Sequence, residues 1–223
     1  TSFARNRVSV EARSISNRMG EARYELTVPV GTRVRATAVS GDIMIRGTQG
    51  EVEVGTVSGD VSLSEAGTVV KVGTVSGTLD LTRLSGRQEV STVSGSVRMV
   101  EVSGDLTLSA VSGRLTVRDA RVTSLRASSV SGEITYDGLF ARDGSYQFSS
   151  HSGSIEFGVP ANAGADLDVQ TFSGRITSDF PLTLRPGETV GRRNNRMQFT
   201  IGAGGARISA ESFSGHVTIR RAS

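Results

Sequence analysis

The sequence predicts an all-β fold: a single-domain parallel β-solenoid with coils of about 18–21 residues. Three observations support this prediction. The dipeptide Ser-Gly recurs along the chain, apolar and polar residues alternate after each Ser-Gly, and glycine is abundant while aromatic residues are scarce. The 223 residues include 27 glycines, no cysteine and no tryptophan, and aromatic residues make up 5%. Such a chain must build its core from small and β-branched side chains and must turn often.

The spacing of Ser-Gly sets the length of a coil. Between Gly77 and Gly113 the dipeptides follow one another every nine residues, and elsewhere the gap is 18, 19 or 21 residues. Alternate dipeptides differ, because every second one is preceded by Thr-Val or Ala-Val. Like residues stack at the true coil period, so two half-units should form one coil of about 18 residues. The last gap, 41 residues, is long enough for two coils.

A parallel arrangement is favoured over a meander of antiparallel hairpins. Two-residue hairpin turns favour Asn-Gly or Asp-Gly, and neither dominates this chain. Antiparallel pairing would also place the Val-Ser-Gly turns at opposite ends of neighbouring strands. A parallel solenoid instead stacks identical residues at identical corners.

The apolar residues indicate which side chains line the core. With the residue before each Ser-Gly counted as position zero, apolar residues fall at positions zero, +4 and +6. Positions +3, +5 and +7 are polar, and this period of two is typical of a half-buried strand. We therefore expect position zero, as at Val75 and Val93, to point into the core. Aspartate at either position should then unfold much of the stack, because a charge would be buried unpaired.

The regularity divides the chain into three stretches. Residues 1–38 lack the Ser-Gly unit and are expected to form N-terminal lead-in or capping strands, at 8–10, 24–28 and 34–36. Residues 39–150 form the regular coils. Residues 151–223 form wider, aromatic-rich coils that contain a polar loop at 183–197. Both end stretches can cap the solenoid, whose ends would otherwise present unpaired strand edges.

The charge balance argues against a nucleic-acid partner. There are 25 basic and 22 acidic residues, so the pI of about 9.9 depends on a small excess. A nucleic-acid-binding domain gathers its basic residues on one face, and this chain spreads them. The one compact basic run, Arg192, Arg193 and Arg196, is expected in a solvated loop. These three arginines are the candidate contact with a partner.

No residue set predicts catalysis, a metal site or a cofactor. Without cysteine there is no disulfide, thiolate zinc site or cysteine nucleophile. Of the two histidines, His151 replaces valine at a corner and is expected to pack there, while His216 falls in an outward polar column. The Gly-Gly-x-Gly-x-Asp repeats of calcium-binding β-rolls are missing, as is Gly-x-Ser-x-Gly. A threonine ladder for ice, at Thr56, Thr74 and Thr92, is not continued along the chain.

Several segments together resemble a known family. These are the repeated Thr-Val-Ser-Gly, Leu-Thr-Val-Pro-Val-Gly at 26–31, and the glycine-rich run 202–208 that leads into 214–219. Over about residues 24–221 the chain resembles the DUF4097 family of adhesin-like bacterial β-strand-repeat proteins. The resemblance implies a right-handed β-solenoid of bacterial origin in an exported setting, the periplasm, the cell surface or the medium. It supplies no catalytic residues.

The expected function is therefore a non-enzymatic, exported surface or envelope solenoid that binds or scaffolds in the manner of an adhesin. Its partner is expected to be a cell-surface glycan or an envelope protein. A signal peptide or anchor is expected to lie outside this sequence, which contains no apolar stretch of about 18 residues that could span a membrane. One alternative is a structural or regulatory envelope module that binds a protein, and it would need an exposed apolar patch. A less favoured alternative is a β-helical polysaccharide-active enzyme. Whether aromatics such as Tyr136, Tyr146 and Phe180 face outward would help to distinguish these alternatives.

Overall fold

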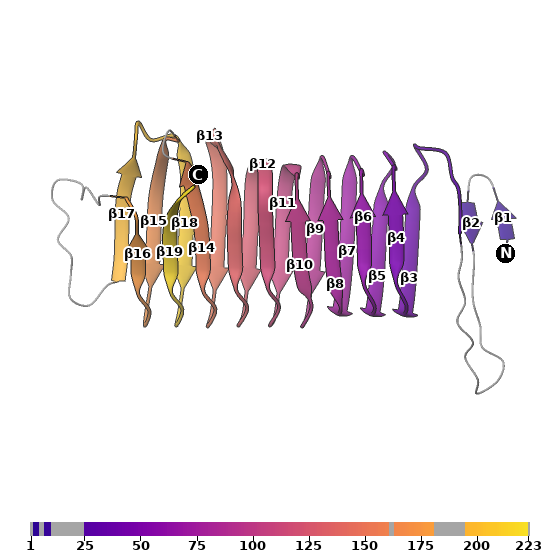
Figure 1. Ribbon diagram of the computed structural model, residues 1–223, viewed down its shortest axis with the longest axis horizontal. Coiled ribbons are helices and arrows are strands. Elements are labelled where there is room, and N and C mark those ends of the chain that lie inside the picture. The colour runs from indigo at the N-terminus through magenta and orange to yellow at the C-terminus, as the bar shows by residue number, and fades with distance from the viewer. Residues whose placement is uncertain (1, 5–6, 10–24, 161–162, 181–194, 223) are drawn as a thin grey trace.

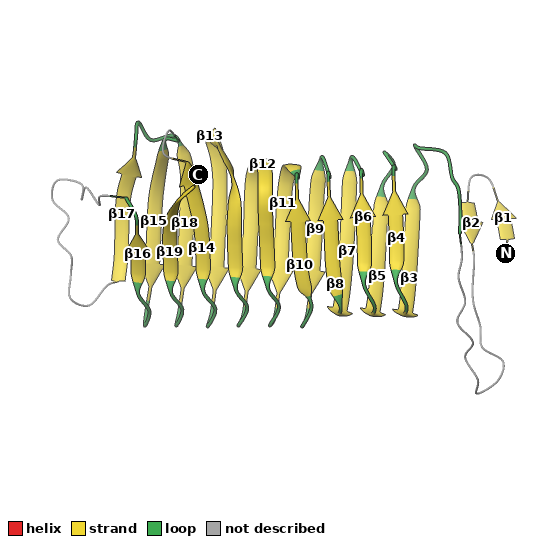
Figure 2. Cartoon of the chain, viewed as in Figure 1, coloured by secondary structure: helices red, strands yellow, loops and turns green. Residues whose placement is uncertain are grey.

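The computed structural model describes residues 2–4, 7–9, 25–160, 163–180 and 195–222. Within these residues every regular element is a β-strand, and the strands wind into a parallel β-solenoid with about 18 residues per turn (Figures 1 and 2). The predicted fold class is confirmed.

Each regular coil consists of two strands separated by two corners. In the coil that begins at β5 (Val52–Ser58), the chain turns at Gly59-Asp60 into β6 (Val61–Ser64) and then enters the next coil. Val52 pairs with Val70, and Val61 pairs with Leu79, so each residue stacks on the residue 18 positions later. The remaining strands of the regular part are β3 (Val34–Ser40), β4 (Ile43–Arg46), β7 (Val69–Ser76), β8 (Thr78–Thr82), β9 (Arg87–Thr92), β10 (Ser96–Val100) and β11 (Ser103–Ala110).

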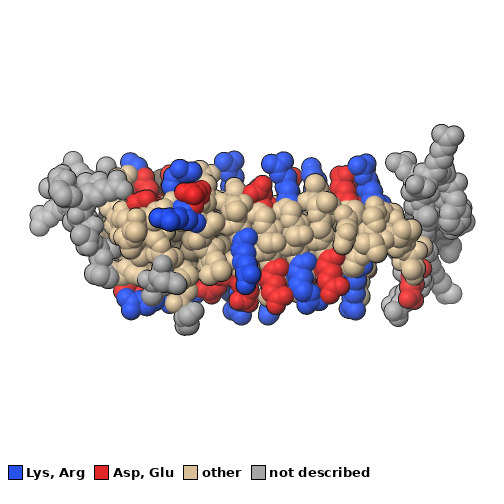
Figure 3. Space-filling view, turned by 90° about the horizontal axis from the view of Figure 1, so that it is seen from above, with Lys and Arg blue, Asp and Glu red and all other residues tan. Residues whose placement is uncertain are grey.

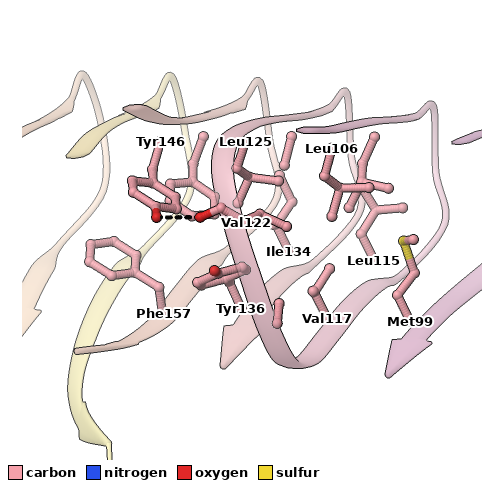
Figure 4. Packing of buried hydrophobic residues seen from close by; sticks show 14 of the residues in the cluster. Met99, Leu106, Leu115, Val117, Val122, Leu125, Ile134, Tyr136, Tyr146 and Phe157 are labelled. Atoms are coloured by element: carbon pink, nitrogen blue, oxygen red, sulfur yellow. Dashed lines mark hydrogen bonds between the residues drawn. The ribbon is translucent and has the colours of Figure 1, made fainter. Parts of the chain in front are cut away.

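The two longest strands, β12 (Leu115–Ser129) and β13 (Ile134–Ser150), continue through a corner and enclose a wider interior. Tyr136 and Tyr146 lie fully buried there (Figure 4). Phe148 and Phe180 are also buried, so none of these aromatics faces solvent. Burial raises the pKa of the Tyr136 and Tyr146 hydroxyls above the usual value. The wider coils therefore need aromatic side chains to fill their core.

The predicted core columns are confirmed at positions +4 and +6. At position zero the prediction is confirmed at Leu84 and Val102, each 1% exposed, and wrong at the corner valines. Val61, Leu63, Leu79 and Leu81 are at most 1% exposed. The exposed fractions of Val75 and Val93 are 44% each. Inward and outward side chains alternate up to the end of the strand that precedes the corner. The threonine before the corner valine points inward, so the valine points outward.

At several corners the backbone of the turn satisfies the inward hydroxyl, whereas Oγ1 of Thr56 has no hydrogen-bond partner among the described residues and Thr74 donates to the carbonyl of Ser76. Thr92 is 4% exposed, and its Oγ1 accepts the N–H of Gly95 at 2.9 Å. Ser129, Ser150 and Ser212 make the same bond to the glycine three residues later, at 2.8 Å. A small hydroxyl residue thus takes the place in the core that the sequence pattern assigned to the valine.

The C-terminal coils do not stack in chain order. The coil formed by β18 (Ala206–Ser212) and β19 (Val217–Ala222) lies between the coil ending in β14 (Ile155–Pro160) and the coil of β15 (Ala165–Thr171) and β16 (Ile176–Ser178). Strand β17 (Asn195–Ile201) then pairs antiparallel with β15 at the end of the stack (Figure 1). The 41-residue gap therefore holds one coil and one capping strand, not two coils.

The N-terminal part differs from the prediction at residues 25–28, which form no strand. There the chain approaches a turn in which the N–H of Thr32 donates to the carbonyl of Pro29 at 3.0 Å. Strands β1 (Ser2–Ala4) and β2 (Arg7–Ser9) form a separate antiparallel pair, and the regular coils begin at Val34. Most of the predicted polar loop lies outside the described residues, and its last three residues begin β17.

Candidate functional site

One corner of the solenoid carries an exposed apolar column, which we call the corner ridge. It occupies the lower ends of the strands in Figure 1, and its apolar members are 44–76% exposed. Each residue stacks on its neighbour through the backbone, as when the N–H of Val111 donates to the carbonyl of Thr92 at 3.2 Å. In stacking order the ridge consists of Val39, Val57, Val75, Val93, Val111, Val130, His151, Phe213 and Phe172.

The residues that follow each ridge position hold the ridge in register. The hydroxyl of Ser94 donates to the carbonyl of Val75 at 3.3 Å, and that of Ser112 to the carbonyl of Val93 at 3.3 Å. The next residue must be glycine at several corners. Gly77 has a φ of 142°, and a Cβ there would lie 2.2 Å from the carbonyl oxygen of Gly59. The Ser-Gly dipeptide therefore locks the corner backbone while leaving the valine side chain in solvent.

A strip of small residues lies beside the ridge, and we call it the furrow. Its members precede the ridge residues by two positions and point outward on the same sheet: Gly55, Gly73, Ser91, Ser109, Ser128 and Ser149. A Cβ added at Gly55 would meet no atom within 4 Å, whereas one added at Gly73 would lie 3.3 Å from Oγ of Ser91, so the strip is open at Gly55 and tighter at Gly73. At about 3.3 Å per strand residue the furrow lies roughly 6.6 Å from the ridge.

A row of charged side chains forms the far wall of the furrow, about 13 Å from the ridge. Its first members alternate in sign: Arg35, Glu53, Lys71 and Glu89. Arg35 approaches Glu53 at 3.4 Å, and Lys71 approaches Glu89 at 3.6 Å. Figure 3 shows the two signs interspersed along the long sides of the molecule. Neither sign dominates this wall.

A second outward column lies past the corner, three residues after each ridge position, as predicted. Its charged members are Asp42, Asp60, Arg114, Glu133 and Arg175, and the side chains of Arg114 and Glu133 are joined by a 2.9 Å hydrogen bond. His216 also belongs to it, and its Nδ1 accepts the N–H of Arg175 at 3.2 Å. The ridge thus runs between a small-residue furrow on one side and this polar column on the other.

Aromatic rings replace valine at the C-terminal end of the ridge. The rings of Phe172 and Phe213 stack in parallel with centroids 4.9 Å apart, and those of His151 and Phe213 are also 4.9 Å apart. His151 therefore lies on the exposed ridge, in contact with a phenylalanine ring. A shallow depression of about 440 Å³ adjoins this stack and is lined also by Gln170 and Glu211.

The predicted basic run is only partly described. Arg192 and Arg193 lie outside the described residues. Arg196 begins the capping strand β17, and its guanidinium binds Asp168 of β15 through Nε at 2.8 Å and Nη2 at 2.5 Å. The hydrogen bond from Arg196 holds the pKa of Asp168 below its usual range. Arg196 thus joins the capping strand to the stack.

The described residues contain no group of three or more histidine, aspartate or glutamate side chains arranged to hold a metal ion. Across the same residues, no helix has the length and apolar character needed to cross a bilayer. The corner ridge is the feature that sequence reasoning missed. The sequence did contain a signal for it. The residue before each corner valine is always alanine, serine or threonine, and it lies an even number of positions from the buried valines of the same strand, so it points inward with them.

Comparison with known proteins gives one match. A family model described as Toastrack DUF4097 matches residues 31–220. No curated protein and no solved structure matches the chain.

Proposed function

This chain belongs to the Toastrack DUF4097 family, and on that basis we propose that it is a non-enzymatic, exported binding and scaffold module of the bacterial cell envelope. The corner ridge is the observation that carries the proposal. Soluble proteins rarely expose large contiguous apolar patches, and those that do use them to bind a partner. A straight column of valines and phenylalanines fixed on a hydrogen-bonded stack is such a patch.

The ridge favours a protein partner over a glycan. A protein interface combines an apolar centre with a polar rim, and the ridge has polar columns on both sides. Glycan platforms use exposed aromatic faces, and Tyr136, Tyr146 and Phe180 are buried. The exposed rings of Phe172 and Phe213 form one stack at the C-terminal end of a ridge that otherwise consists mostly of valines. An envelope module that binds another protein, which requires an exposed apolar patch, is therefore better supported than a module that binds a glycan.

The placement of the perturbed titratable groups supports a non-enzymatic role. Catalytic groups with shifted pKa values gather in a cleft. Here the clearly shifted groups among the described residues are Tyr136, Tyr146, Asp168 and Arg220, which belong to the core or to ion pairs. None of them lines the depression beside the aromatic stack.

Removing the apolar side chains of the ridge tests the proposal. The ridge variant carries Val75→Ser, Val93→Ser and Val111→Ser, and the matched control carries Asp80→Ser, Arg98→Ser and Thr116→Ser on the opposite sheet. Both proteins are incubated with sedimented bacterial envelopes, and the bound fraction is measured. We expect the ridge variant to bind about tenfold more weakly and the control to bind like the unmodified chain. Unchanged circular dichroism would exclude misfolding as the cause.

Two results would contradict the proposal. Release of reducing ends from envelope polysaccharides by the chain would show that it is an enzyme. Binding on a glycan array that is equally strong for the ridge variant would move the function away from the ridge and to a carbohydrate ligand.

A further inference from the structure

From the charges and shape of the sheet that carries the ridge, we infer that a second copy of this chain covers the ridge in an antiparallel two-fold dimer, ridge against ridge. This inference rests on the proposed function and names the partner of the same surface. The two-fold axis lies along the strand direction. A rotation about this axis reverses the stack, turns the two sheet faces toward each other and leaves the position along a strand unchanged. Each column of side chains therefore meets the same column of the other copy.

The contact face is the outward side of one long sheet. In stacking order this sheet consists of β3, β5, β7, β9, β11, β12, β13, β18 and β15. The stack is straight (Figures 1 and 3), so the columns of two antiparallel copies stay in contact along its length. Because β11 is the middle strand of the series, full overlap places the axis over β11 and sets Val111 against Val111 of the second copy.

Two charged columns lie on this face. The far wall continues beyond Glu89 with Thr107, Arg126, Gln147, Ser209 and Asp168. Two residues further from the ridge lies another column, which we call the outer column. In stacking order it consists of Arg33, Glu51, Val69, Arg87, Asp105, Ser124, Ser145, Arg207 and Asp166.

The register of full overlap pairs opposite charges in both columns. Four pairs face each other across the interface, and each of them occurs twice by symmetry: Glu89 with Arg126, Arg35 with Asp168, Glu51 with Arg207, and Arg33 with Asp166. Within the described residues of the two columns, like charges meet only at the axis, where Asp105 faces Asp105 of the second copy. Opposite charges across an interface fix its register, because like charges repel in the others.

Other arrangements lack this match. Moving one copy by one strand sets Lys71 against Arg126 in one direction and Glu53 against Asp168 in the other. A two-fold axis along the stack gives a parallel dimer, in which equivalent coils face each other. If that axis lies between ridge and furrow, only these two columns overlap, in a strip about 7 Å wide. If it lies over the far wall, every charge of the wall faces its own copy.

The shape of the face is also self-complementary in this register. The furrow continues into the C-terminal coils with Glu211 and Gln170, which are larger than the glycines at its N-terminal end. Glu211 faces Gly55 of the second copy, where an added Cβ would meet no atom within 4 Å. On the ridge, Phe213 faces Val57. The larger side chains of the C-terminal half therefore lie against the smaller ones of the N-terminal half.

The contact area matches that of a stable dimer. From β3 to β15 the face extends about 40 Å along the stack, and from the ridge to the outer column it extends about 20 Å along the strands. Roughly 800 Å² per copy would therefore be buried, and standard protein interfaces bury about 800 Å² per partner.

A cysteine cross-link tests the position of the axis. The chain has no cysteine, so one introduced thiol per copy is specific. Val111→Cys places both thiols of the dimer on the axis, between faces about 10 Å apart and within reach of a bismaleimide linker of about 8 Å. Val57→Cys is the matched control, since the exposed fraction of Val57, 48%, is close to the 46% of Val111. Its two copies would lie six strand spacings apart, about 29 Å.

Charge reversal tests the register. Glu89→Arg and Arg126→Glu each set like charges against each other twice in the dimer. A mixture of the two variants can form a heterodimer in which both contacts join opposite charges. The matched control Glu65→Arg also loses an exposed intramolecular partner, Arg83, but lies at the opposite corner. Multi-angle light scattering at several concentrations measures the dissociation constant.

We expect a dimer for the unmodified chain and for Glu65→Arg, a dissociation constant about tenfold higher for each of the other two variants, and a restored dimer for their mixture. Val111→Cys should cross-link, and Val57→Cys should run as a monomer on a denaturing gel. A monomeric unmodified chain would overturn the inference. Equal cross-linking at both positions, or a mixture that stays monomeric, would overturn the antiparallel arrangement.

This partner and the proposed function can fail separately. Envelope binding by a monomeric chain that the ridge variant loses would leave the proposed function standing while refuting this partner. A dimer without envelope binding would do the reverse.

Discussion

The hydroxyl of Tyr146 donates a hydrogen bond to the carbonyl of Val122 at 2.6 Å and accepts the N–H of Ala141 at 2.7 Å. One phenol thus joins the corner of its own coil to the preceding coil, inside an otherwise apolar core (Figure 4). Tyr136 makes a longer bond, 3.3 Å, to the carbonyl of Leu139. Tyr146 therefore bonds two backbone groups at short distance, whereas Tyr136 bonds one at long distance.

Tyr146→Phe should lower the free energy of unfolding by about 1–3 kcal/mol, because it leaves a buried carbonyl and a buried N–H without this partner. Tyr136→Phe is the matched control and should cost less, since its bond is long. Urea denaturation followed by circular dichroism measures both. Equal losses for the two variants would contradict the assigned role of Tyr146.

The same tyrosines should make the protein sensitive to alkali. Burial raises the pKa of both hydroxyls in the folded state above the usual tyrosine value of about 10. The folded state therefore holds protons that the unfolded state releases, and stability falls as the pH rises above about 10. Thermal melts between neutral pH and pH 11 should show the decline begin near the unfolded pKa. A Tyr136→Phe and Tyr146→Phe double variant should show a shallower decline.

Exchanging residues on the two sides of the backbone at one corner tests the direction of the ridge. Thr92→Val removes the buried Oγ1 that accepts the Gly95 N–H and should cost about 1–2 kcal/mol. Val93→Asp, on the exposed side, should change stability by less than about 0.5 kcal/mol. Melting temperatures of the two variants decide the question. A large loss at Val93 would show that the valine is buried after all.

The corner glycines should differ sharply from the furrow glycines. Gly77→Ala forces a side chain into a φ of 142° and against the carbonyl of Gly59, so it should cost more than about 2 kcal/mol. Gly55→Ala meets open space and should leave the melting temperature nearly unchanged. Differential scanning calorimetry compares them. Similar melting temperatures would mean that the corner backbone can relax.

The ion pair at the capping strand should stabilise the chain less in acid. Arg196 lowers the pKa of Asp168, so the folded state favours the carboxylate. Its contribution is complete above the usual pKa of about 4 and is lost as the pH falls through the lowered pKa of the folded state. Arg196→Ala should therefore destabilise the chain more at pH 7 than at pH 3. Both side chains are more than a third exposed, so the loss should stay within about 1 kcal/mol. An equal effect at both pH values would contradict the ion-pair explanation.

The coil length and two of the three core columns could be predicted from the sequence, because stacking repeats the same residue at the same place. Val61 and Leu79 lie where their period of two indicated. The prediction failed at Val75 because it relied on hydropathy. Valine is more apolar than threonine, but the alternation of side chains along the strand determines that Thr74 points inward and Val75 outward. A polar residue can occupy a buried position when the turn supplies its hydrogen-bond partner.

The ion pairs beside the ridge could not be predicted, because they depend on relationships between coils. The partners in Lys71–Glu89 and Arg114–Glu133 are 18 and 19 residues apart, and only the register of the coils brings them together. The order of the last coils also escapes local reasoning. Nothing in the spacing of Ser173-Gly174 and Ser214-Gly215 shows that the later coil lies closer to the regular stack.

The intercalated coil of β18 and β19 has a consequence for biosynthesis. A ribosome delivers residues from the N-terminus, and coils up to β14 can add to the growing stack as they emerge. Strands β15 and β16 cannot reach their final places when they emerge, because their neighbours on the inner side, β18 and β19, are translated after them. A chain released before β18 and β19 have been made therefore ends in an open edge at β14, and the C-terminal coils can close only once both strands are present.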